Sequence, residues 1–154
     1  MYHLMQRPGI TNAMAYRNQR GSRRDSPVES ATRILIVDSD RQVGTSLTFM
    51  LSARGYDEVR AVRSARRAVA IAESFRPGLV FLDIELPDHG ALEVADRLRK
   101  GARPHTMRLI ALTSNSEHER REEDRAAGFE RYLMKPLAQS ELDKILGSSP
   151  PPMA

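Results

Sequence analysis

The sequence between residues 33 and 147 alternates short apolar runs with longer amphipathic segments. Five apolar runs have the length of buried strands and lie at 33–37, 58–62, 79–82, 108–112 and 131–134. Five helices are expected after them, at 41–53, 64–75, 91–100, 116–127 and 140–146. This alternation predicts an α/β fold with a parallel sheet and helices on both of its faces. Because crossovers between parallel strands are right-handed, the carboxyl ends of all five strands should lie along one edge of the sheet.

Polar residues and glycines mark the ends of several expected helices. Ser64 is placed to cap the second helix. Ser116 with Glu119 forms a capping box at the start of the fourth helix. Ser140 indicates the start of the last helix, and Gly147 is a typical helix stop.

The two ends of the chain fall outside this pattern. Residues 1–32 mix Gly, Pro, Ser, Asn and Arg without periodicity, which predicts a basic, disordered extension, and residues 148–154 should form a flexible tail. The formal net charge is +4. The extension has five arginines and two acidic residues, so it carries most of this excess and leaves the folded part nearly neutral. The extension is therefore either a solvated tail or an arm for an acidic partner, and the fold lacks the charge of a DNA-binding domain.

Composition excludes several other classes of protein. The chain has no cysteine, so disulfides, thiolate metal sites and cysteine nucleophiles are ruled out. The four histidines (His3, His89, His105 and His118) do not have the spacing of metal ligands. No apolar stretch is long enough to span a bilayer, and we expect a cytoplasmic protein.

Polar residues of complementary chemistry follow four of the five apolar runs. They are Asp38, Ser39 and Asp40 after the first run, Asp83 after the third, Thr113 and Ser114 after the fourth, and Lys135 after the fifth. Open α/β sheets bind their ligands at the carboxyl ends of the strands. Acids, hydroxyls and one ammonium at this edge predict a site for a metal ion and a phosphoryl group.

The order of these residues resembles the receiver domain of bacterial response regulators. The resemblance covers about residues 33–147. It rests on the acidic cluster after the first run, on Asp83 with Pro87 and Gly90 beyond it, on Thr113-Ser114, and on Lys135-Pro136. It implies a flavodoxin-like (βα)5 doubly wound sheet of strand order 2-1-3-4-5. It also implies a cis peptide bond between Lys135 and Pro136.

The resemblance further implies a phosphoacceptor role for Asp83. An ionised Asp83 would attack phosphorus and become an aspartyl phosphate. Positive charge must offset the repulsion between this carboxylate and the phosphoryl group. The resemblance assigns that task to Lys135 and to Mg²⁺, which would be held by Asp38, Asp83 and the backbone carbonyl of Glu85. Thr113 would donate a hydroxyl hydrogen bond to a phosphoryl oxygen, and Ser114 is small enough to let backbone N–H groups approach the phosphoryl group.

The expected activity is that of a signalling switch, not of a turnover enzyme. The phosphoryl donor would be a histidine kinase or a histidine phosphotransfer protein. Thr113 and Tyr132 would form the switch, although Tyr132 also fits a half-buried strand tyrosine. The face made by the fourth helix, fifth strand and last helix would then bind an unknown downstream protein or a second copy of the chain. The charged helix at 116–127 also fits an ordinary solvated surface. No DNA-binding domain and no membrane partner are expected, which favours a stand-alone receiver similar to chemotaxis regulators.

One position departs from the family pattern. The family usually has two acidic residues at the end of the first strand, and here the second is Ser39. A serine hydroxyl is a poorer ligand for Mg²⁺ than a carboxylate. Either Asp40 or Glu85 compensates, or the affinity for the metal is low. An atypical receiver that signals through protein contacts without phosphorylation is therefore an alternative.

A phosphatase of the haloacid dehalogenase type is a weaker alternative. Asp38-Ser39-Asp40 matches the D-x-D start of its first motif. However, Gln42 stands where threonine or valine is expected, no acidic pair follows Lys135, and Asp83 would have no role.

Overall fold

Five parallel strands form a single sheet in the computed structural model, which describes residues 27–29, 31–102, 106–115 and 128–147. The strands are β1 (Ile34–Val37), β2 (Val59–Val62), β3 (Leu79–Asp83), β4 (Arg108–Thr113) and β5 (Arg131–Met134). Their order in the sheet is β2-β1-β3-β4-β5, which confirms the predicted order 2-1-3-4-5. The Lys135–Pro136 peptide bond is cis, as expected.

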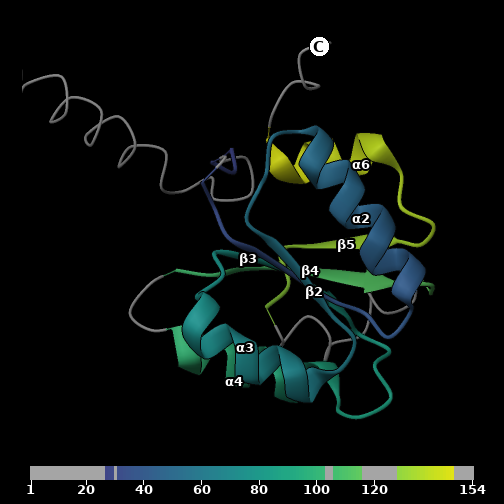
Figure 1. The fold of residues 1–154 in the computed structure, drawn as a ribbon. Helices are drawn as coiled ribbons and strands as arrows, with labels where there is room; N and C mark the ends of the chain where they lie inside the picture. Colours follow the sequence, from purple (N-terminus) through teal and green to yellow (C-terminus); the bar gives the residue numbers. More distant parts are fainter. Residues whose placement is uncertain (1–26, 30, 103–105, 116–127, 148–154) are drawn as a thin grey trace, which may run out of the picture.

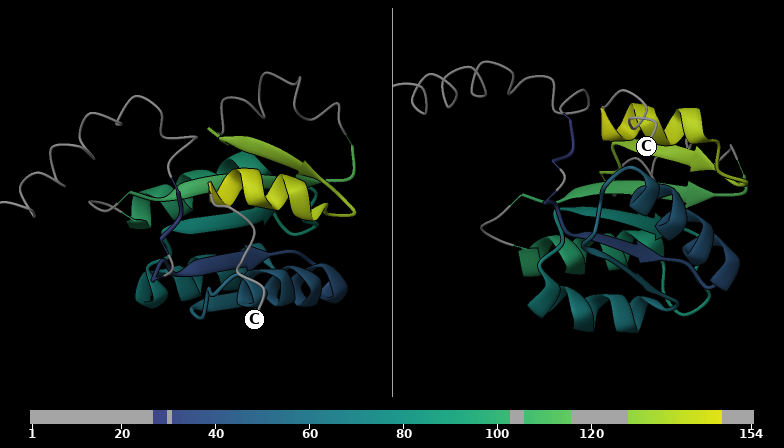
Figure 2. Two further views of the ribbon diagram at one scale, coloured as in Figure 1. Left: turned by 90° about the horizontal axis from the view of Figure 1, so that it is seen from above. Right: turned by 45° about the horizontal axis from the view of Figure 1, so that its top comes forward.

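Helices cover both faces of the sheet and give a doubly wound, three-layer arrangement (Figure 1). The described helices are α2 (Arg41–Ala53), α3 (Ala65–Phe75), α4 (Ala91–Ala102) and α6 (Gln139–Leu146). Helices α2 and α6 lie on one face, and α3 and α4 lie together on the other (Figures 1 and 2). The fourth helix predicted from the sequence, at 116–127, lies outside the described residues.

The apolar core lies in two layers, one on each face of the sheet. One layer joins the sheet to α2 and α6 and includes Ile34, Leu47 and Phe81. The other joins it to α3 and α4 and includes Leu35, Val80 and Leu98. All residues of β1 and β3 are buried, because the two strands lie inside the sheet with helices on both sides. This explains why their sequences are continuous apolar runs without polar alternation.

Side-chain caps fix the starts of two helices. Asp40 precedes α2, and its carboxylate accepts a hydrogen bond from the Gln42 N–H at 2.8 Å. Ser64 caps α3 as predicted, because its hydroxyl accepts from the Arg67 N–H at 3.1 Å. The prediction for the last helix was wrong by one residue. Helix α6 begins at Gln139 after Ala138, which caps it with no side-chain hydrogen bond.

The packed fold begins before the boundary predicted at residue 33. Val28 is only 8% exposed and belongs to the core layer under α2 and α6. Its N–H donates to the Leu146 carbonyl at 2.8 Å, and its carbonyl accepts from the Tyr56 hydroxyl at 2.7 Å. This part of the N-terminal segment is therefore held by the end of α6, while residues 1–26 lie outside the described residues.

In the part of the chain that the structure describes, no helix combines the length and the apolar character needed to cross a membrane.

Two phenylalanines with opposite surroundings provide a test of this core. Phe81 is 0% exposed in the central strand β3, whereas Phe49 on α2 is 74% exposed. We expect Phe81→Ala to lower the free energy of unfolding by about 3 to 5 kcal/mol, because it opens a cavity in a packed layer. Phe49→Ala should change it by less than about 0.5 kcal/mol. Urea unfolding followed by circular dichroism measures both, and equal effects would contradict the described packing.

Candidate functional site at the carboxyl edge of the sheet

Three residues that the sequence analysis selected lie together at the carboxyl edge of the sheet. Asp38 follows β1, Asp83 ends β3 and Lys135 follows β5. The Lys135 Nζ lies 2.7 Å from Asp38 Oδ2 and 3.5 Å from Asp83 Oδ2. Both aspartates are almost fully buried, at 2% and 3% exposure. One ammonium thus bridges two buried carboxylates.

Backbone hydrogen bonds fix the positions of these three residues. The Asp38 N–H donates to Val62 of β2, and the Lys135 N–H donates to the Thr113 carbonyl of β4. Each aspartate also accepts a hydrogen bond at Oδ1 from the N–H two residues further along the chain. For Asp38 the donor is Asp40 at 2.9 Å, and for Asp83 it is Glu85 at 2.8 Å. Each carboxylate therefore has one oxygen held by its own loop and the other turned to Lys135.

The buried charges shift two pKa values. Burial raises the pKa of the Asp83 carboxyl, and the nearby charge of Asp38 raises it further. The hydrogen bond from the Glu85 N–H and the charge of Lys135 oppose this rise without cancelling it. Burial alone would lower the pKa of Lys135, but its ion pairs with Asp38 and Asp83 outweigh burial and raise it. Lys135 therefore keeps its positive charge at neutral pH.

The two hydroxyl residues at the end of β4 are engaged with their own surroundings. Thr113 is fully buried. Its Oγ1 donates to the Asn115 carbonyl and accepts from the Asn115 N–H, both at 3.0 Å. The Ser114 N–H and hydroxyl both donate to the Glu85 carboxylate. The sequence indicates a role for Glu85 only at the metal and carries no signal for its contact with Ser114.

The acids at this edge form a small donor set for a metal ion. Asp38 and Asp83 are close enough to share Lys135, whereas Asp40 caps α2 and Ser39 is exposed. In the described ranges, no cluster of three or more histidine, cysteine or acidic residues is arranged around a common metal position. Mg²⁺ commonly uses one or two carboxylates together with phosphate oxygens and water. Asp38 and Asp83 fit that pattern, with the Glu85 carbonyl as the predicted third protein ligand.

Tyr132 lies in β5 and is half-buried. Its ring packs edge-on against Phe129, with 5.8 Å between the ring centroids, and contacts the core layer under α3 and α4. This matches the strand-tyrosine alternative from the sequence, and its role as a switch stays a prediction.

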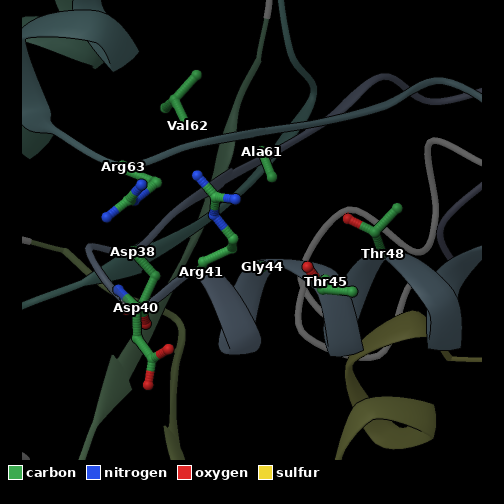
Figure 3. A pocket seen from close by; sticks show the side chains of 9 residues that line it. All are labelled: Asp38, Asp40, Arg41, Gly44, Thr45, Thr48, Ala61, Val62 and Arg63. Atoms are coloured by element: carbon green, nitrogen blue, oxygen red, sulfur yellow. Dashed lines mark hydrogen bonds between the residues drawn. The ribbon is translucent and has the colours of Figure 1, made fainter.

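A pocket of about 360 Å³ lies beside Asp38, between α2 and β2 (Figure 3). It is lined by Asp38, Asp40, Arg41, Gly44, Thr45, Thr48, Ala61, Val62 and Arg63. Arg41 and Arg63 lie at the same end of the pocket as the two acids (Figure 3). Arg63 also donates through Nε to the Ser39 carbonyl at 3.3 Å. Positive charge therefore lies next to the position where the family usually has its second acid.

The loop after Asp83 is also tied to the start of α3. The Asp88 carboxylate accepts hydrogen bonds from the Ala65 N–H at 3.1 Å and from the Arg66 N–H at 3.3 Å. The loss of water around the Asp88 carboxylate raises its pKa, but these backbone hydrogen bonds have the larger combined effect, and the net pKa is lowered. No feature of the sequence linked residue 88 to residue 65, so this contact could not be predicted.

The raised pKa of Asp83 predicts the effect of removing its charge. At pH 7 the ionised carboxylate opposes folding, so Asp83→Asn should raise the free energy of unfolding by on the order of 1 kcal/mol in metal-free buffer. Below the unfolded pKa of about 4 both states are protonated, and this difference should vanish. Urea unfolding with a chelator between pH 7 and pH 3 measures it. A less stable variant at pH 7 would contradict the electrostatic account.

The lowered pKa of Asp88 predicts the opposite effect on stability, because the ionised carboxylate favours the folded state. The contribution of Asp88 to stability should be present above its unfolded pKa of about 4 and be lost as the pH falls through the lower folded pKa. We expect Asp88→Ala to lower the free energy of unfolding at pH 7 by less than about 1 kcal/mol, because the carboxylate is exposed. Asp96→Ala, on the exposed surface of α4, is the matched control. Thermal unfolding at pH 7 and at pH 2 measures both, and a loss of the same size at both pH values would argue against the ionic contact.

Comparisons with known proteins agree with this geometry. The family model for the response regulator receiver domain matches residues 34–147. The response regulator MprA of Mycolicibacterium vanbaalenii is 37% identical over 110 residues, which cover 71% of this chain and 46% of that protein. The transcriptional regulatory protein PdtaR of Mycobacterium tuberculosis is 29% identical over 122 residues, which cover 79% of this chain and 58% of that protein. The chain thus spans about half the length of these two relatives.

A solved structure shows the same fold. The CheY-like response regulator receiver domain protein of Methanospirillum hungatei is 33% identical and superimposes with a TM-score of 0.64. The matched region covers 73% of this chain and 87% of that one. With the matched family model, the strand order and the cluster of Asp38, Asp83 and Lys135, the chain belongs to the response regulator receiver domain family.

Proposed function

We propose that this protein is a phosphoacceptor receiver in which Asp83 takes a phosphoryl group from a phosphohistidine. The observation that carries the proposal is the position of Lys135 between Asp38 and Asp83. A fixed ammonium beside a buried carboxylate provides the positive charge that phosphoryl transfer to an anion requires. The protein acts as a switch, and the phosphorylated state is its signal.

The transfer is a substitution at phosphorus. Asp83 attacks as the ionised carboxylate through the oxygen that faces Lys135, and a new O–P bond forms while the bond from phosphorus to the donor's imidazole nitrogen breaks. The electron pair of the broken bond stays on that nitrogen. Lys135 stabilises the charge on the phosphoryl oxygens, and the Glu85 N–H keeps the second oxygen of Asp83 in place. Mg²⁺, when bound by Asp38, Asp83 and the Glu85 carbonyl, supplies further positive charge.

The donor is a histidine kinase or a histidine phosphotransfer protein. The response is a change in partner binding at the face that includes β5 and α6, to which Tyr132 belongs through β5. Thr113 connects the two regions, because it ends β4 and its carbonyl accepts a hydrogen bond from the Lys135 N–H. A movement of Thr113 towards a phosphoryl group would break its two hydrogen bonds with Asn115. This would shift the conformational equilibrium of the loop after β4.

A receiver that works without phosphorylation is the second candidate. Ser39 favours it, because the serine is exposed and leaves the site with two carboxylates near Lys135. Such a protein would use the same folded surface to bind a partner constitutively.

A phosphate-affinity gel separates the two candidates. The native chain is incubated with acetyl phosphate and Mg²⁺, beside Asp83→Asn and the control Asp96→Asn, which removes an exposed acid on α4. We expect a retarded band for the native chain and the control, and its loss in Asp83→Asn. Lys135→Ala should reduce the fraction phosphorylated by about tenfold or more, because it removes the fixed charge. If the native chain shows no retarded band, the phosphorylation-independent receiver is favoured.

A further inference from the structure

The side chain of Glu85 binds the residue that follows Thr113. Glu85 Oε1 accepts hydrogen bonds from the Ser114 N–H at 3.0 Å and from the Ser114 hydroxyl at 2.9 Å, and Oε2 lies 3.1 Å from the same hydroxyl. Hydrogen bonds to a carboxylate are stronger than those between neutral groups. One anion thus engages both the backbone and the side-chain donor of Ser114.

This contact lies between the two loops that border Asp83. Strands β3 and β4 pair up to Asp83 and Leu112, and the Ile84 N–H donates to the Leu112 carbonyl at 3.1 Å. Glu85 and Ser114 therefore follow directly from neighbouring strand ends. The Thr113 hydroxyl is meanwhile bonded to Asn115. In this conformation the Thr113 hydroxyl and both donors of Ser114 are hydrogen-bonded to groups of the protein.

We propose that Glu85 is an internal anion that occupies the Ser114 donors in the unphosphorylated state and must release them when a phosphoryl group arrives. The inference rests on the proposed function of Asp83. A phosphoryl oxygen and the Glu85 carboxylate are both anionic acceptors, and they compete for the same donors. Their like charges also repel each other at short distance. Glu85 is exposed, so its side chain can move into water without uncovering the core.

This contact between the Glu85 carboxylate and Ser114, called the latch below, makes the Glu85 side chain a regulator of phosphoryl binding, while only the Glu85 backbone serves the transfer itself. Its carboxylate stabilises the resting conformation of the loop after β4 and opposes the phosphorylated one. Removing the charge should shift the equilibrium towards the phosphorylated conformation. The effect requires Ser114, because that residue supplies both of the competing donors.

Beryllofluoride, a phosphoryl mimic, provides the probe, and fluorine NMR of the native chain with Mg²⁺ measures its affinity. We expect Glu85→Gln to bind it about tenfold more tightly, which corresponds to the loss of roughly one charge-assisted hydrogen bond in the resting state. Glu85→Ala should act in the same direction. The matched control is Glu93→Gln, which removes an equal charge from an exposed glutamate of α4 that lies near His89. Equal gains in Glu85→Gln and Glu93→Gln would overturn the latch in favour of general charge repulsion.

Coupling to Ser114 gives the second readout. In a Ser114→Ala background one of the two donors is lost, so the gain from Glu85→Gln should be clearly smaller than in the native background. An unchanged gain would overturn the role of Ser114. If the native chain binds beryllofluoride at Asp83 and Glu85→Gln binds it no better, the latch fails while the proposed function stands. If neither chain binds it, the proposed function fails and the latch falls with it.

Discussion

The charge balance around Lys135 determines how this site can exist. Two carboxylates buried side by side would repel each other strongly, and neither has much water to screen its charge. One ammonium between Asp38 and Asp83 offsets only part of this repulsion, and the pKa of Asp83 stays raised. In the folded protein, part of the repulsion between the two carboxylates therefore remains. A divalent cation held by the two acids would relieve this repulsion, because it adds positive charge where Lys135 alone is not enough.

The scaffold around this charged cluster is apolar and closely packed. Strands β1 and β3 are buried on both faces; Asp38 directly follows β1, and Asp83 ends β3. The apolar runs set the register of the parallel strands, and the register brings the strand ends to one edge. Hydrogen bonds from the following loops then orient the carboxylates. The core thus fixes where the charges lie, and the loops fix how they point.

This division explains what could be predicted from the sequence. The two helical layers and the strand-end positions of Asp38, Asp83, Thr113 and Lys135 follow from period and spacing, whereas the strand order was implied by the family resemblance. The structure places three of these four residues, Asp38, Asp83 and Lys135, in contact. The contacts of Glu85 with Ser114 and of Asp88 with Ala65 could not be predicted, because they join loops that are distant in the sequence and carry no periodic signal. The start of α6 was misplaced for a related reason. Ala138 supplies only a backbone carbonyl, which the sequence does not reveal.

The anchoring of Val28 also has a practical consequence. Val28 is attached to Leu146 and Tyr56, which lie near the amino-terminal ends of the strands, whereas Asp83 lies at the carboxyl ends. A fluorophore or affinity handle joined directly before Val28 would therefore be attached at the side of the sheet opposite the acidic cluster. Such a label could follow binding at the carboxyl edge of the sheet without obstructing it.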